Sequence, residues 1–225
     1  MAFINRYEKK CALCSNVHHF QKLGENNSFG MRDLDTRPPG MMRNMMHLMV
    51  EKCPKCGYAS YNISKLLDNL TIDEINSTSY QNILNDENIN FALKKFMLLA
   101  KLYETRDNKQ AGLAYLRASW MADDCKNLKF AKTMRSKAIK YLENSLDLSQ
   151  DDDSINIKLI VVDLYRRIEL FEEASDYAKF LLNNIGLEKY KRNILMYQIK
   201  LCQDEDSLDH TIPGNYNFLV EKTNE

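Results

Sequence analysis

Hydrophobic side chains recur at steps of three and four residues through the second half of the chain, which predicts amphipathic helices. Six such stretches follow one another, separated by short polar turns. Their apolar stripes fall within residues 91–104, 108–120, 128–146, 157–168, 171–181 and 187–201. The pattern predicts an all-α region made of three antiparallel helix pairs.

Two of these pairs resemble tetratricopeptide repeats, in which a large, a small and an aromatic residue of one helix precede a small residue of the next. The matching positions are Leu99, Ala100, Tyr103 and Gly112 in one pair and Val161, Val162, Tyr165 and Ala174 in the other. The two tyrosines are 62 residues apart, which is not a multiple of the 34-residue repeat, and the closing proline is absent. We therefore expect a tetratricopeptide-like array of helical hairpins.

The N-terminal segment carries two Cys-x-x-Cys pairs, Cys11 with Cys14 and Cys53 with Cys56. In the second pair Pro54 and the following glycine favour a tight knuckle, in which two thiolates converge. Four thiolates at this spacing are the ligand set of a tetrahedral structural zinc site. The sequence predicts a small zinc-ribbon-like β head with one structural Zn²⁺ per chain, although loss of zinc and disulfide formation would make a redox switch instead.

The remaining histidines and cysteines carry weaker signals. His18, His19 and His47 lie near the knuckles, but four cysteines already complete a tetrahedron, so we expect surface or supporting roles for these imidazoles. Cys125 and Cys202 fall singly in helical patterns, where we expect small buried packing residues.

Between the knuckles lie two unusual segments. Asp33 and Asp35 alternate with an apolar residue before a Pro-Pro-Gly turn, and together with His47 they suggest a secondary cation or hydrolytic site. Arginines flank both acids, so a local salt-bridged turn is the favoured interpretation. The stretch 41–49 holds five methionines, which favours packing against the next helices over partner or metal binding.

Domain boundaries follow from these patterns. We expect a zinc-ribbon-like domain over residues 1–65, a polar connector over 66–88, a tetratricopeptide-like helical domain over 89–206 and a C-terminal tail over 207–225. The tail contains a short turn with proline and glycine that either docks on the helices or frays.

Charge and targeting signals narrow the functional classes. The chain carries 31 basic and 31 acidic residues, and residues 1–60 hold nine basic against five acidic ones. This balance disfavours a protein devoted to nucleic acid. The N-terminus has no apolar core of a signal peptide and no stretch is long enough to span a membrane, so we expect a cytoplasmic protein.

The order of these motifs resembles an uncharacterised prokaryotic family with a domain of unknown function. The residues that carry the resemblance are Cys11, Cys14, Asp33, Asp35, Cys53, Pro54, Cys56, Gly57, Tyr58 and Ala59. The resemblance covers most of the chain and implies a zinc-ribbon-like head with a tetratricopeptide-like tail. It implies no particular activity.

For function, we expect a non-enzymatic interaction protein whose helical surface holds a protein or peptide partner. The residues of that surface are not identifiable from the sequence. The alternative is nucleic-acid binding by the basic head, through Arg32, Arg37, Arg43, Lys52, Lys55, Phe20, Phe29 and Tyr58. An enzyme is the least favoured class, because the chain lacks a phosphate loop, a nucleophile elbow and a His-Glu-x-x-His helix.

Overall fold

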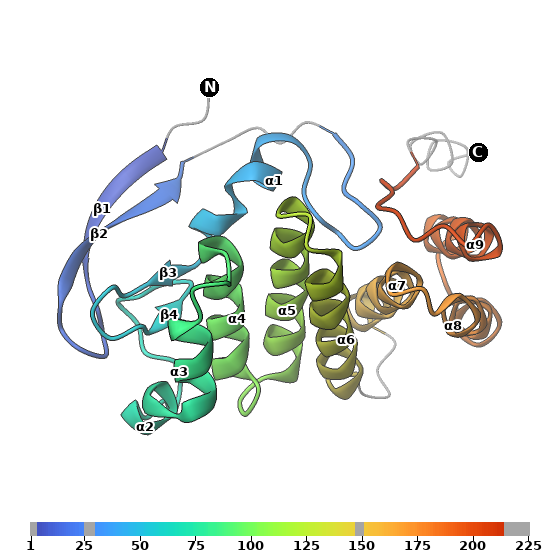
Figure 1. Ribbon diagram of the computed structural model, residues 1–225. Coiled ribbons are helices and arrows are strands. Elements are labelled where there is room, and N and C mark those ends of the chain that lie inside the picture. Colours follow the sequence, from blue (N-terminus) through green and yellow to red (C-terminus); the bar gives the residue numbers. More distant parts are fainter. Residues whose placement is uncertain (1–3, 25–29, 147–150, 214–225) are drawn as a thin grey trace. The chain divides into compact units, whose positions relative to one another are not determined.

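A computed structural model describes residues 4–24, 30–146 and 151–213 (Figure 1). The chain divides into two compact units. Unit 1 combines the N-terminal segment with Gly40–Tyr141, and unit 2 combines residues 30–39 with the chain from Leu142 onward. The cysteine-rich head and the first long helices therefore share one unit, and the connector expected over 66–88 lies inside it.

Unit 1 begins with two β-hairpins. Strands β1 (Ile4–Lys10) and β2 (Val17–Leu23) pair antiparallel, with Lys10 opposite Val17. Strands β3 (Glu51–Lys52) and β4 (Ala59–Ser60) form the second, much shorter hairpin. Between them lie the short helix α1 (Gly40–Met45) and a 3₁₀ turn, η1 (Met46–Leu48). The predicted small β head is confirmed.

The polar segment after β4 contains two short helices, α2 (Ile72–Asn76) and α3 (Thr78–Asn85). Thr71 and Glu74 form a capping box at the start of α2, and the Ser77 hydroxyl accepts the N–H of Tyr80 at the start of α3. The Arg106 guanidinium donates to the Glu74 carboxylate at 2.5 Å. This bond fixes α2 to the turn that follows the first long helix.

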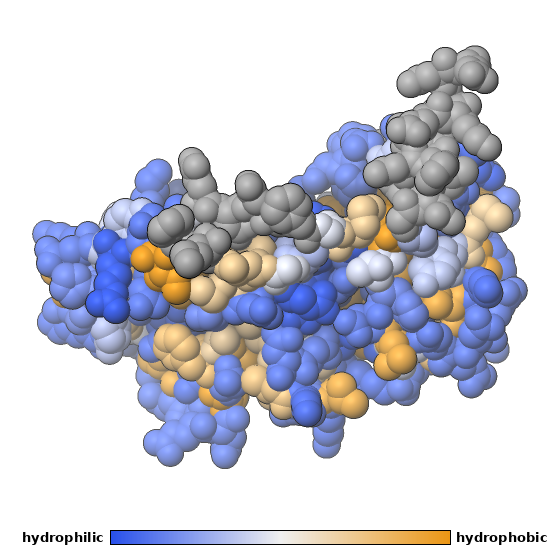
Figure 2. Space-filling view, turned by 90° about the horizontal axis from the view of Figure 1, so that it is seen from above, coloured by the Kyte–Doolittle hydropathy of each residue, from blue (hydrophilic) through white to orange (hydrophobic). Residues whose placement is uncertain are grey.

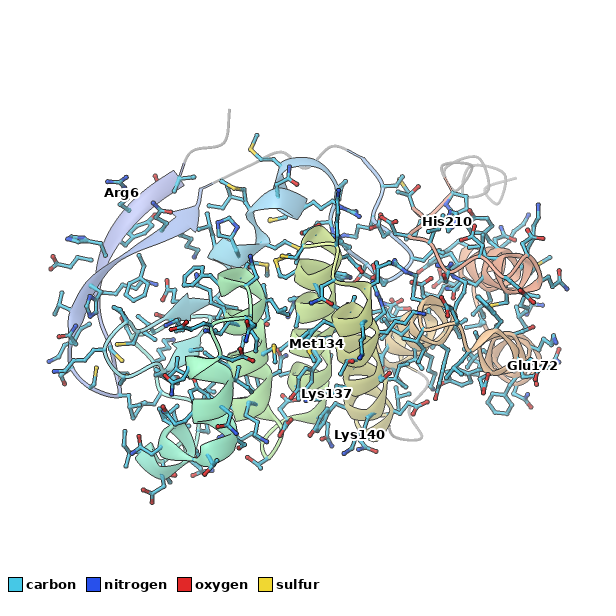
Figure 3. The ribbon with its side chains drawn as sticks, in the orientation of Figure 1. Arg6, Met134, Lys137, Lys140, Glu172 and His210 are labelled. Atoms are coloured by element: carbon cyan, nitrogen blue, oxygen red, sulfur yellow. The ribbon has the colours of Figure 1, made fainter. Side chains whose placement is uncertain are left out.

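Three long helices complete unit 1: α4 (Phe91–Tyr103), α5 (Asn108–Asp124) and α6 (Leu128–Asn144), the last of which crosses the unit boundary. Asn90 caps α4 and Asp107 caps α5 through side-chain oxygens that accept main-chain N–H groups. Small residues of α5 are buried where α4 packs against it: Ala111, Gly112, Ala114 and Ala118. On α6, which carries the labelled Met134, Lys137 and Lys140 in Figure 3, Met134 is buried and both lysines are exposed. The Lys137 and Lys140 ammonium groups lie 5.0 Å and 5.5 Å from the ring centres of Tyr115 and Tyr141.

Unit 2 contains α7 (Asp152–Arg167), α8 (Phe171–Asn184) and α9 (Lys189–Gln203). Asp151 accepts the N–H of Ser154 at 2.7 Å and caps α7, and Asp152 and Asp153 place negative charge in its first turn. The three helices enclose an apolar core formed by Ile155, Leu159, Val162, Ala178, Leu181, Ile185 and Leu195. The predicted all-α region is confirmed, while its likeness to tetratricopeptide repeats stays a prediction.

The segment that contains Asp33 and Asp35 belongs to unit 2. Leu34 is buried against Ile194 and Leu201 of α9. Its N–H donates to the His210 carbonyl at 2.9 Å, and Asp33 forms an isolated antiparallel bridge with Thr211. The start of the expected C-terminal tail therefore docks within unit 2, and residues 214–225 lie outside the described residues.

A buried ion pair lies inside unit 2. The Arg166 guanidinium donates to Asp163 Oδ1 at 2.7 Å, and both side chains are at most 2% exposed. Arg166 also donates to the Asp206 carbonyl, which joins α7 to the turn after α9. A guanidinium at this depth needs its carboxylate, because an unpaired charge in a low-dielectric interior is strongly unfavourable.

We expect Asp163→Ala to destabilise unit 2 by about 3–5 kcal/mol, because it removes the buried carboxylate of Arg166 and leaves only the partly exposed Asp206 carboxylate, 3.9 Å away. Hydrogen exchange of amides in α7, α8 and α9 measures the change. The control is Asp176→Ala, which breaks the exposed pair with Lys179 and should shift stability by less than about 1 kcal/mol. Equal effects of the two substitutions would contradict the assigned role.

Candidate metal centre

Each Cys-x-x-Cys pair forms the turn of one of the two β-hairpins, and the two turns have the same pattern of main-chain hydrogen bonds. In the first, the Cys11 N–H donates to the Asn16 carbonyl at 2.8 Å and the Ser15 N–H donates to the Cys11 carbonyl at 2.9 Å. In the second, the Cys53 N–H donates to the Tyr58 carbonyl at 2.8 Å and the Gly57 N–H donates to the Cys53 carbonyl at 3.0 Å. The first knuckle therefore matches the second although it lacks a proline.

The fourth residue after each leading cysteine adopts a left-handed backbone. Ser15 has φ of 59° and Gly57 has φ of 78°. This conformation turns the chain back after the second thiol of each pair and favours glycine. At Gly57 a side chain is disfavoured for a second reason, since a Cβ atom there would lie 2.5 Å from Leu84 Cδ2 of α3, and the leucine side chain would have to move.

The two knuckles bring four cysteine sulfur atoms together, all within 4.8 Å of one another. Cys11 Sγ lies 3.7 Å from Cys56 Sγ, and Cys14 Sγ lies 3.6 Å from Cys53 Sγ. A tetrahedral ion with metal–sulfur bonds of about 2.3 Å requires sulfur atoms about 3.8 Å apart. The observed spacing fits one shared ion, and it is far too long for a disulfide bond.

The chemical environment of the sulfurs also suits a cation. Cys11 and Cys53 are buried, and Cys14 and Cys56 are half-buried. Burial raises the pKa of the Cys11 and Cys56 thiols, because the apolar surroundings disfavour their charged form. A divalent cation reverses this preference, since it binds thiolates and displaces their protons. The four sulfurs therefore form a cluster that could hold a metal ion, and a bound ion would favour their convergence.

A buried glutamate ties the two hairpins together beside this cluster. Glu51 lies at the start of β3, and each of its carboxylate oxygens accepts a hydrogen bond. One oxygen accepts from the Lys9 Nζ of β1 at 2.5 Å, and the other accepts from the Ile63 N–H at 2.8 Å. The Ile63 carbonyl in turn accepts the Ala12 N–H inside the first knuckle at 2.9 Å. These bonds set the distance between the hairpins on which convergence of the sulfurs depends. These bonds are not predictable from the sequence, because the partners lie 42 and 12 residues from Glu51.

Two buried tyrosines hold the second knuckle against the helices. The Tyr80 hydroxyl of α3 donates to the Gly57 carbonyl at 2.9 Å. The Tyr58 hydroxyl donates to the Lys65 carbonyl at 2.8 Å and accepts the Leu67 N–H at 3.1 Å. Burial raises the pKa of both phenols, so they remain neutral hydrogen-bonding groups. Tyr58 is fully buried and cannot stack on a nucleic-acid base, which corrects one part of the nucleic-acid interpretation.

The residues of the suggested secondary site lie in different units, Asp33 and Asp35 in unit 2 and His47 in unit 1. Asp35 Oδ1 accepts the Arg37 N–H at 3.1 Å, and the Asp33 N–H donates to the Arg37 carbonyl at 3.0 Å. These bonds, which involve the main chain of Arg37, close a local turn, and the salt bridges expected from the flanking arginines stay a prediction. Within the described ranges, the four cysteines alone form a group of three or more potential ligands for one ion, so the secondary site stays a prediction.

Two further cysteines and two of the histidines lie at positions that test what their sequence context indicates. Cys202 is buried as expected, whereas Cys125 is exposed. The expectation for Cys125 was wrong because α5 ends at Asp124, so that Cys125 is the residue after its last turn. His18 contacts Asn16 of the first knuckle, and His19 lies 3.9 Å from Glu8 on the surface of the hairpin. These histidines have the supporting and surface positions that their sequence context indicates.

Comparison with known proteins identifies the family of this chain. Residues 5–204 match a family described as "uncharacterized protein conserved in bacteria (DUF2225)", so the chain belongs to that family. No curated protein and no solved structure matches the chain. Within the described part of the chain, no helix is long and apolar enough to cross a membrane. On the face drawn in Figure 2, hydrophobic residues form small groups divided by hydrophilic ones.

We expect Cys53→Ser to abolish binding of the metal and to cost several kcal/mol of unit 1 stability, because a structural metal contributes its binding free energy to folding. Metal content per chain and hydrogen exchange in β1–β4 measure the two effects. Cys125→Ser is the matched control, since it removes an exposed thiol outside the cluster. A head that stays protected from exchange after complete metal removal would contradict the assignment.

We expect Gly57→Ala to destabilise unit 1 by at least about 1–2 kcal/mol, the usual penalty of a left-handed backbone for an L-residue. The crowding against Leu84 adds to this penalty. Gly186→Ala is the control, because nothing lies within 4 Å of a Cβ atom there. Chemical denaturation of both variants measures the difference, and similar midpoints would show that neither constraint acts.

Proposed function

We propose that this member of the DUF2225 family is a non-enzymatic zinc-binding interaction protein, in which one structural Zn²⁺ holds the head and the helices bind a protein or peptide partner. The observation that supports it best is the closed geometry of the four cysteines. Four protein ligands fill a tetrahedral coordination sphere and leave no position for a substrate or a reactive water. A site of this kind supplies stability rather than chemistry.

Zinc is the ion that this ligand set favours. An all-thiolate tetrahedral site suits Zn²⁺ or iron among the common metals. The four sulfurs come from two hairpins of the kind that structural zinc sites use, each with two residues between its cysteines. Free thiolates of this kind need a reducing compartment, which supports a cytoplasmic location. A thiol-based redox sensor remains the alternative for the same four residues.

For the partner, unit 2 offers a polar groove of about 540 Å³ along α8 and the end of α9. Its charged residues are Glu172, Asp176, Glu205 and Lys179. Lys179 forms an ion pair with Asp176 at 3.2 Å, so the carboxylates of Glu172 and Glu205 leave the groove with a net negative charge. Glu172 of α8 is labelled in Figure 3. Charge complementarity then favours a partner segment that carries lysine or arginine.

The first test is native mass spectrometry of the protein purified gently from cell lysate under reducing conditions. We expect one zinc per chain together with a protein or peptide adduct. The double variant Glu172→Lys/Asp176→Lys should lose the adduct and keep the zinc, because it reverses the charge of the groove only. Asp68→Lys/Glu87→Lys makes the same charge change on exposed positions of unit 1 and should keep both.

Two results would overturn the proposal. Iron in place of zinc would make a redox role the preferred interpretation of the four cysteines. Saturable turnover of a substrate by the zinc-bound protein, abolished by a single substitution that leaves the zinc in place, would end the non-enzymatic assignment.

A further inference from the structure

Unit 1 contains a cleft that adjoins the second knuckle but is lined by none of the four cysteines. Its volume is about 1010 Å³, at the upper end of the range usual for small-molecule sites. One wall is formed by β1 and β2, and the other by η1, β3 and the start of α4. The lining includes apolar side chains, among them Phe20, Leu48 and Val50, and charged groups from both walls.

Positive charge collects in this cleft. Arg6, Lys52 and Lys95 line it, and none of the three has a carboxylate within ion-pair distance among the residues that the structure describes. Of the two acids of the cleft, Glu51 accepts hydrogen bonds from Lys9 and the Ile63 N–H. Glu8 lies 3.9 Å from His19, an imidazole that offsets its charge only when it is protonated. Three cations against two acids give the lining a formal charge of +1, although the whole chain is neutral.

Lys95 is the most unusual of these cations. It is only 8% exposed, and its Nζ donates to the His47 carbonyl at 3.0 Å. A buried ammonium is normally paired with a carboxylate, because desolvation disfavours the charge. Burial, together with the Lys52 ammonium, lowers the pKa of Lys95 to about 8. An anion in the cleft would supply the missing negative charge.

An exposed aromatic ring lies beside this ammonium. Phe91, the first residue of α4, is 58% exposed, and the Lys95 Nζ lies 4.7 Å from the centre of its ring. Large apolar side chains at this exposure in a cleft offer a free face for stacking. Arg6 stands on the opposite wall, where it projects from β1 (Figure 3). The cleft thus combines compact positive charge with a flat apolar surface.

We propose that this cleft binds a nucleoside phosphate, with the phosphate at Lys95, Lys52 and Arg6 and the base against Phe91. The cations match the phosphate, because lysine and arginine are the usual phosphate ligands in proteins. The ring matches the base, because every base presents a π face that stacks on an aromatic side chain. The ligand is either a free nucleotide or a nucleotide within a single strand, and the same groups recognise both.

Calorimetric titration of the metal-bound protein with AMP at about 50 mM salt tests the proposal, since phosphate binding weakens as salt rises. We expect saturable binding, and binding of adenosine or inorganic phosphate alone should be at least about tenfold weaker. Single-stranded oligo(dA) of about ten nucleotides distinguishes the two sources of the ligand. Tighter binding of the oligonucleotide than of AMP identifies a nucleic acid, and weaker binding identifies a free nucleotide.

Matched variants locate the binding. Lys95→Met should weaken AMP binding by about tenfold or more, because it removes a charged hydrogen-bond donor. Lys94→Met is its control, since the Lys94 Nζ also donates to a main-chain carbonyl at 3.0 Å but does not line the cleft. Phe91→Ala should weaken binding at least about fivefold, and Phe180→Ala, an equally exposed ring on α8, should leave it unchanged.

Arg6→Gln provides a variant whose folding is not in question, because Arg6 is exposed on β1. It should also weaken binding of AMP. Three results would overturn the proposal: no saturable binding of AMP, binding that Lys95→Met and Arg6→Gln leave unchanged, or phosphate that binds as tightly as AMP. Since none of these measurements depends on a protein partner, they are independent of the proposed interaction role.

Discussion

The convergence of four cysteine sulfurs is the constraint on which the head of this protein depends. The paired strands that carry the second knuckle are only two residues long, and most of β1 is exposed. Such hairpins bury too little apolar surface to be stable alone. A metal shared by both knuckles would join them at one point, and the bonds of Glu51 to Lys9 and Ile63 join them at a second. The head is therefore ordered by these specific bonds together with a small group of buried side chains that includes Met46, Val50 and Ile63.

These bonds also connect the metal centre to the helices. The second knuckle places Gly57 against Leu84, and its carbonyl accepts the hydroxyl of Tyr80 from α3. On the next helix, Lys95 reaches back to the carbonyl of His47, just before β3. For this reason the head belongs to the same compact unit as α2–α5 and most of α6, and it does not form a separate domain. Loss of the metal is then expected to loosen the packing of the helices that border the head, and not the two hairpins alone.

Most elements of the fold are predictable from the sequence because their signals are local. The apolar stripes locate α4–α9, and the residues Asn90, Asp107 and Asp151 that cap three of these helices are visible in the sequence. The ligand residues of the metal site are predictable for the same reason, since each pair occupies one short turn. The left-handed backbone at Ser15 is not, because serine gives no sign of it.

What the sequence does not predict is set by contacts between distant segments. Leu34 lies between two cysteine pairs of unit 1, yet it packs on α9 of unit 2. The alternation of polar and apolar residues around Leu34 indicates a strand-like segment. It does not identify the segment that pairs with this one, which contains His210 and Thr211. The exposure of Cys125 was also missed, because periodicity continues by one residue past the point where the helix ends. Periodicity reports which face is apolar, and only packing decides what covers it.

The net charge of the chain is the clearest example of a sequence property that does not predict local structure. A net charge of zero argues against an anionic ligand when it is taken as a property of the whole chain. In the structure the charges are distributed unevenly: Arg6, Lys52 and Lys95 line a cleft of unit 1, whereas Glu172, Asp176 and Glu205 line a groove of unit 2. Because electrostatic interactions in salt solution extend only about 10 Å, each surface acts through its own local charge. A neutral protein can then present a cationic site and an acidic site, and the total charge excludes neither an anionic nor a basic partner.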